Sequence, residues 1–221
     1  MGERIRIHDD GSALDGYLAT PRESPSPGIV VIHEWWGLVP HIEEVCDRFA
    51  SDGFMAFAPD LCGRTTTEPD EAEKIMMELD FPRAIEQISQ AIAHLRAHPA
   101  ANGKVAVAGF CMGGALTLAA AAKSGPDAAV PFYGVPSKDP GYDEIRCPVL
   151  GHWAEHDDWA SQDIGRSLFE RLASNGIEAT LYVYPGTEHA FFNDHRPEVY
   201  DESAALTAYA RTLEFLRRHL L

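Results

Sequence analysis

The stretch from Lys104 to Gly114, KVAVAGFCMGG, decides the fold of this chain. Its apolar run predicts a buried strand over 104–108. A glycine-rich turn at 109–114 follows, and the alanine-rich segment Ala115–Lys123 predicts a helix directly after it. A strand that ends in a tight turn and leads into a helix is the unit from which open α/β sheets build their sites.

The rest of the chain repeats this alternation of strand and helix. Glu3–His8 and Asp15–Ala19 predict two antiparallel leading strands, with a turn at Asp10-Gly11. Apolar runs predict further strands over Gly28–His33, Phe54–Ala58, Ala128–Tyr133, Pro148–Trp153 and Ala179–Tyr184. Apolar residues at helical spacing predict helices around 42–50, 85–95, 164–172 and 206–220. We therefore expect an α/β fold with a mostly parallel sheet covered on both faces, as a single domain over residues 1–221.

The charge of the chain limits its partners. It carries 34 acidic and 18 basic residues, a formal net charge of -16. Such a field repels phosphate backbones and anionic membranes, so we expect no nucleic acid and no membrane as a partner. An anionic small substrate is still compatible with this net charge, because the local charge inside a pocket can have the opposite sign. The chain has no apolar signal core near Met1 and no apolar run long enough to span a membrane.

The four cysteines, Cys46, Cys62, Cys111 and Cys147, are widely scattered and form no Cys-x-x-Cys pair. At this chain length a disulfide scaffold is unnecessary, so we expect reduced thiols and a cytoplasmic setting. Three of them have the context of small buried hydrophobic residues. The context of Cys111 differs.

Gly109-x-Cys111-x-Gly113 fits the nucleophile elbow, with cysteine in place of serine. The glycines are needed because side chains two residues on either side would collide with backbone. The positive end of the following helix favours a thiolate. The alternative is a chance cysteine in an ordinary glycine-rich turn. No serine stands in a Gly-x-Ser-x-Gly context, which disfavours a serine hydrolase.

Partners for Cys111 follow in the chain order that hydrolase triads use: nucleophile, acid, histidine. Asp157 comes just after one predicted strand and His189 just after the next, both at strand ends where open α/β sheets build their sites. His189 is the candidate base, and Asp157 would orient its imidazole. Asp158 is the rival acid. The structural alternative for His189 is a surface loop histidine, and that for Asp157 is a helix N-cap.

His33-Glu34-Trp35-Trp36-Gly37 follows the first buried strand, where such folds usually supply one oxyanion-hole amide. The N–H groups of Trp35 and Met112 are the candidate donors. The segment also reads as a plain strand-end turn with two packing tryptophans. We expect no metal, because the second histidine of a His-Glu-x-x-His site is absent and His152 and His156 straddle a strand end.

Four segments together resemble the dienelactone hydrolase family: His33–Gly37, Ala58–Leu61, Gly109–Gly114 and Gly186–Phe191. They occur in the family's order along nearly the whole chain. The cysteine elbow combined with the upstream His-Glu motif is more specific than either motif alone.

The resemblance implies the α/β-hydrolase fold and a triad of Cys111, His189 and Asp157. It implies that Glu34 engages the resting thiol and helps to deprotonate it when substrate arrives. The implied reaction is the opening of an enol lactone, dienelactone (carboxymethylenebutenolide), through a thioester acyl-enzyme. No cofactor is implied.

The resemblance also implies that two arginines hold the substrate carboxylate. Arg64 is placed like the first, and a guanidinium suits bidentate carboxylate binding. The second is expected where Asn193 stands, and we interpret the nearby Arg196 as a solvated surface charge. The tryptophans Trp35, Trp36, Trp153 and Trp159 surround the motif loops, and we expect Trp36 among the residues that line an apolar substrate pocket.

The sequence thus favours a cysteine-dependent hydrolase whose partner is a small lactone or ester. A general carboxylesterase or thioesterase with the same triad is the second hypothesis. A redox-responsive or binding protein with a sensor thiol at Cys111 is the third, and the complete triad order argues against it. A monomer and a small homo-oligomer are both compatible with the sequence.

Overall fold

The computed structural model describes residues 2–9 and 12–221. The turn expected at Asp10-Gly11 lies outside the described residues. The strands are β1 (Glu3–Asp9), β2 (Ser12–Ala19), β3 (Ser26–Ile32), β4 (Met55–Pro59), β5 (Ala101–Phe110), β6 (Ala128–Phe132), β7 (Val149–His156) and β8 (Ala179–Glu188). The helices are α1 (Pro40–Ser51), α2 (Pro69–Glu78), α3 (Phe81–Ala97), α4 (Met112–Lys123), α5 (Gln162–Ser174) and α6 (Glu202–Leu220), with a 3-10 turn at Tyr142–Glu144.

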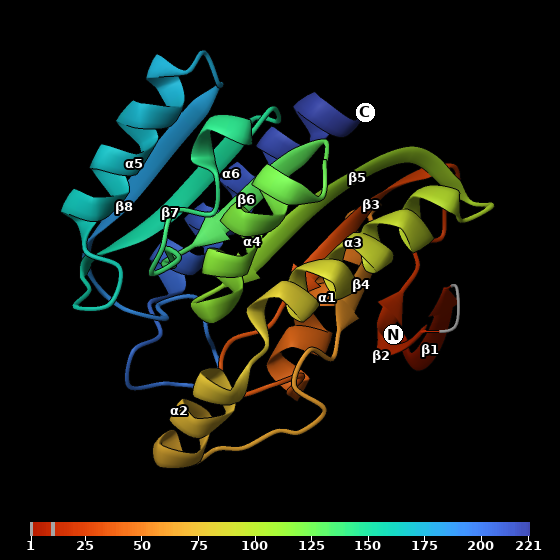
Figure 1. Ribbon diagram of the computed structural model, residues 1–221, viewed down its shortest axis with the longest axis horizontal. Coiled ribbons are helices and arrows are strands. Elements are labelled where there is room, and N and C mark those ends of the chain that lie inside the picture. The colour runs from red at the N-terminus through yellow and green to blue at the C-terminus, as the bar shows by residue number, and fades with distance from the viewer. Residues whose placement is uncertain (1, 10–11) are drawn as a thin grey trace.

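The strands form one sheet in the order β1-β2-β4-β3-β5-β6-β7-β8. β1 and β2 pair antiparallel, β2 joins β4 antiparallel, and from β4 to β8 the pairings are parallel. Helices α3, α4 and α5 cover the front of the sheet in Figure 1, and α6 lies behind it. The predicted mostly parallel α/β sheet, with its two antiparallel leading strands, is confirmed.

Strand β3 shows why the central strands are continuously apolar. Ile29 and Val31 pack with α1 and α6 on one face, while Val30 and Ile32 pack with α3 and α4 on the other. All four side chains are fully buried. Because successive side chains of a strand point to opposite faces, a strand covered on both sides needs apolar residues at every position.

The structure corrects the predicted elements in two respects. Helix α2 was not predicted; it projects beyond the carboxyl edge of the sheet (Figure 1) and buries only Ala72 and Ile75. Two of the predicted strands, 104–108 and 179–184, are also too short, since β5 starts at Ala101 and β8 continues to Glu188. Within the described ranges, no helix is long and apolar enough to cross a membrane.

Candidate active site

Cys111 lies at the sharp turn between β5 and α4. Its backbone angles, φ 55° and ψ −116°, fall in a region that non-glycine residues rarely adopt. A Cβ on Gly109 would collide with the carbonyl oxygen of Gly113, and a Cβ on Gly113 would collide with that of Ile32. The glycines therefore allow the elbow to pack directly against the end of β3, as the sequence pattern predicts.

His189 and Asp157 form the second part of the site. His189 Nδ1 lies 2.7 Å from Asp157 Oδ2, and the carboxylate of Asp157 is fully buried. Asp157 Oδ1 accepts hydrogen bonds of 2.8 Å from the backbone N–H groups of Trp159 and Ala160. Asp158 is exposed, and no hydrogen bond or ion pair reaches its carboxylate from the described residues. The structure thus places Asp157, and not Asp158, against the histidine.

Charges and hydrogen bonds hold this histidine in its protonated form. Burial opposes the charge on His189, but hydrogen bonds to Asp157 and Cys111, and their charges, raise its pKa to about 10. Burial likewise opposes the charge on Asp157, yet hydrogen bonds from His189 and two amides lower its pKa overall. The surroundings of His189 therefore favour an imidazolium beside the sulfur of Cys111.

Glu34 enters the site from the loop after β3 and is buried. Its Oε2 accepts a 2.6 Å hydrogen bond from Asn193 Nδ2, while its Oε1 is buried without a partner among the described residues. His33 fixes the loop: its Nδ1 lies 2.6 Å from the carbonyl oxygen of Glu34, and its Nε2 accepts from the N–H of Leu61. Burial lowers the pKa of His33, so its role here is that of a neutral structural histidine.

Tyr133 is a site residue that the sequence analysis missed. It follows β6 with a positive φ of 35°, and its ring lies edge-on to that of His189 with 5.1 Å between centroids. Its hydroxyl is buried without a partner in the described part of the chain. Burial raises the pKa of Tyr133, and the charges of Glu34 and Cys111 nearby raise it further. No sequence motif marks this position.

The side chains of the candidate catalytic residues line one cleft of about 760 Å³. Glu34, Cys111, Asp157 and His189 follow β3, β5, β7 and β8, so the site lies at the carboxyl edge of the parallel strands. Trp35, Trp36 and Trp159 also line the cleft. Trp153 does not: it is fully buried and packs edge-on to Phe169.

The candidate oxyanion donors lie on the two segments that meet at the elbow. Met112 is the first residue of α4, whose initial N–H groups have no intrahelical acceptor. Trp35 lies two residues beyond His33, whose carbonyl oxygen a Cβ on Gly113 would also meet. Both candidates are therefore on backbone that packs around Cys111.

One group in the described residues could hold a metal ion: His41, Asp194 and His195. It lies outside the cleft that holds Cys111. His152 is a core residue that hydrogen-bonds Tyr184 and Thr212, and burial lowers its pKa to about 3.

Comparison with known proteins gives the context for this geometry. The model of the dienelactone hydrolase family matches residues 14–220. The chain belongs to this family. It is 36% identical to the protein named usf of Aquifex pyrophilus, with all of both chains covered. It is 31% identical to carboxymethylenebutenolidase 1 of Cupriavidus pinatubonensis, over 93% of this chain and 92% of that one.

Among solved structures, a dienelactone hydrolase-like promiscuous phosphotriesterase from metagenomic libraries superposes with a TM-score of 0.87. It is 22% identical and the match covers 100% of this chain and 99% of that one, which shows a shared fold. The expected α/β-hydrolase fold is thus confirmed. As a family member, the chain is a hydrolase with ester-hydrolysing activity.

The structure places the two arginines differently from our interpretation of the sequence. Arg64 does not line the cleft: its guanidinium pairs with Glu78 on α2 and faces a separate depression. Arg196, which we interpreted as a surface charge, does line the cleft, with its guanidinium 5.6 Å from the ring centre of Trp36. The structure therefore does not support Arg64 as a substrate ligand in this dienelactone hydrolase relative.

Proposed function

We propose that the protein is a cysteine-dependent hydrolase that cleaves carboxylic esters and lactones through a thioester acyl-enzyme. The observation that carries this proposal is the strained elbow at Cys111 beside the His189–Asp157 pair. An imidazolium with a pKa of about 10 is a charge partner for a thiolate, which is the nucleophilic form of cysteine.

The reaction follows from these positions. The Cys111 thiolate attacks the carbonyl carbon, and the N–H groups of Trp35 and Met112 stabilise the oxyanion. Collapse of the tetrahedral adduct breaks the C–O bond, and the leaving oxygen takes the proton of His189. Water then attacks the thioester and gives a proton to His189, and the thiolate leaves. The net products are one acid and one alcohol, which stay joined in one molecule when the substrate is a lactone.

Asp157 and Glu34 support these steps. Asp157 holds Nδ1 of His189, so that Nε2 faces the reacting atoms and the cationic form is stabilised. Glu34 is a buried carboxylate whose free Oε1 is available to accept a proton or orient water. Because the reaction starts from a thiolate and an imidazolium, we propose that this oxygen orients the water that attacks the thioester.

Family membership alone points to an enol lactone such as dienelactone as one substrate candidate. Its carboxylate would bind Arg196, the one arginine or lysine lining the cleft in the described part of the chain. A neutral carboxylic ester or thioester is the second candidate. It is favoured because Arg64 is turned away and Asn193 donates to Glu34 instead of offering a cation.

The test is a hydrolase panel of dienelactone and uncharged p-nitrophenyl esters. Cys111→Ala should abolish turnover, and Cys111→Ser should retain little, because a hydroxyl is far less acidic than a thiol. Cys62→Ala, a half-buried cysteine outside the cleft, is the matched control. Mass spectrometry of acid-quenched enzyme should find the acyl group on the Cys111 peptide. Turnover retained by Cys111→Ala would overturn the nucleophile assignment.

A further inference from the structure

The mouth of the cleft carries negative charge that the protein does not neutralise. Asp158, Asp163 and Glu188 line the cleft and are exposed. No hydrogen bond or ion pair to their carboxylates is found within residues 2–9 and 12–221. The cleft's Arg196 is already paired with Glu198 at 2.8 Å. A substrate entering this cleft therefore meets carboxylates that have no internal cation.

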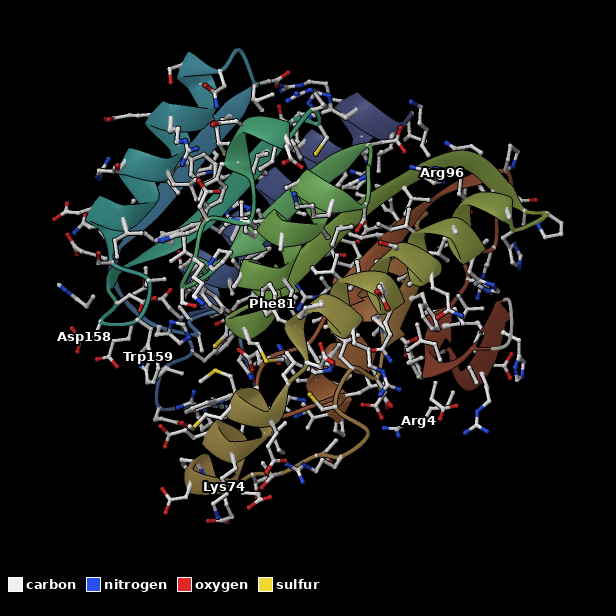
Figure 2. All side chains as sticks on the ribbon, in the orientation of Figure 1. Arg4, Lys74, Phe81, Arg96, Asp158 and Trp159 are labelled. Atoms are coloured by element: carbon white, nitrogen blue, oxygen red, sulfur yellow. The ribbon has the colours of Figure 1, made fainter. Side chains whose placement is uncertain are left out.

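An exposed tryptophan stands beside these carboxylates. Trp159 follows Asp158 on the loop after β7, and Figure 2 shows the two side chains together at the edge of the molecule. The Trp159 side chain is 65% exposed, and its ring meets that of Trp35 edge-on with 6.0 Å between centroids. The face of an indole ring attracts cations, and a nearby carboxylate strengthens that attraction.

The spacing of the carboxylates distinguishes between kinds of cation. A metal ion needs several ligand atoms close together, and in the described residues only His41, Asp194 and His195, outside the cleft, are so grouped. Carboxylates that are not grouped closely enough to bind a metal, beside an aromatic face, suit a larger organic cation instead. The net charge of -16 would also draw cations toward the protein.

We propose that the cleft mouth selects ester substrates that carry an ammonium group. The cation would lie on the face of Trp159 and near Asp158, while the ester carbonyl reaches Cys111. The same carboxylates would oppose an anionic substrate. This inference rests on the proposed function, because it concerns the same cleft. It selects the ester candidate over the anionic lactone and orders the substrates: cationic esters before neutral ones, and neutral ones before anionic ones such as dienelactone.

The test uses ester pairs that differ only in charge. On the acyl side these are the p-nitrophenyl esters of 4-(trimethylammonio)butanoate and of its uncharged isostere 5,5-dimethylhexanoate. On the alcohol side they are acetylcholine and 3,3-dimethylbutyl acetate. In at least one pair, kcat/KM for the cation should exceed that for the isostere about tenfold at low salt. The ratio should fall as added salt shortens the screening length. The p-nitrophenyl monoester of glutarate, an anion, should be poorer than both.

Variants of Asp158 and Trp159 test whether these two residues cause the preference for the cationic ester. Asp158→Asn and Trp159→Leu should each lower the cation-to-isostere ratio about threefold. Glu86→Gln, which removes one exposed carboxylate on α3 outside the cleft, should leave the ratio unchanged. Equal kcat/KM values within both pairs, or ratios that Asp158→Asn and Trp159→Leu leave intact, would overturn this proposal. Cys111-dependent turnover of the neutral isosteres would still stand, so the two proposals fail separately.

Discussion

Replacing Cys111 with alanine should lower the pKa of His189 without returning it to 6.5. In the wild-type protein this pKa is raised from 6.5 to about 10, a difference worth about 5 kcal/mol in favour of the imidazolium. Asp157 and Cys111 supply the stabilisation, and burial opposes it. A single neighbouring charge typically moves a pKa by about 1 to 3 units. Without the sulfur, Asp157 alone should hold His189 between about 7 and 9.

The assay is an NMR titration of the imidazole resonances between pH 6 and 11, assigned with a His189→Gln variant. Cys62→Ala is the control and should reproduce the wild-type curve, because Cys62 does not line the cleft. A wild-type His189 that titrates near 6.5 would refute the thiolate–imidazolium pair. An unchanged pKa in Cys111→Ala would refute the assigned contribution of Cys111.

Three further perturbations test the rest of the site. Asn193→Ala removes the 2.6 Å hydrogen bond to the buried Glu34 carboxylate. The free energy of unfolding, measured with urea at pH 8, should fall by about 1.5–3 kcal/mol, and a fall below about 0.5 kcal/mol would contradict this. Gly113→Ala would drive a Cβ into carbonyl oxygens at the end of β3, so calorimetry should find it less stable by about 1–3 kcal/mol, and an unchanged Tm would count against this packing. Since the pKa of His189 is raised on folding, its stabilisation is complete below about pH 6.5 and should decline until about pH 10. Urea unfolding across that range should show the decline in the wild type and much less of it in Asp157→Asn, and equal slopes would contradict the assignment.

The meeting of Cys111, Asp157 and His189 at one edge of the sheet could be predicted, because the order of the strands determines it. Cys111, Asp157 and His189 each follow a strand, and the carboxyl ends of parallel strands meet at one edge of the sheet. The sequence favours Asp157 over Asp158, but the sequence alone cannot decide between them. The choice depends on the loop conformation in which Asp157 accepts two backbone hydrogen bonds, and adjacent residues of the same type give no sequence signal for that.

The position of Arg64 outside the cleft has a physical cause. Arg64 turns toward Glu78, and Glu78 belongs to α2, the helix that the apolar pattern did not reveal. This helix buries only two side chains, so it has no long apolar stripe. The available signals were Pro69 at its first turn and the acidic residues after it. Tyr133 was missed for another reason, since a lone tyrosine at a strand end resembles any core aromatic residue.

The bond from the Trp159 amide to Asp157 has a practical consequence for engineering. On the Trp159 side the bond uses only the main-chain N–H, while the side chain lines the cleft and is largely exposed. In the proposed mechanism, position 159 would thus hold the triad acid through its backbone and meet the entering molecule through its indole. Saturation mutagenesis at codon 159 can therefore broaden or redirect substrate scope while the acid stays anchored. Proline is the exception, since it has no N–H to donate. A screening library at this site should keep most of its members catalytically competent.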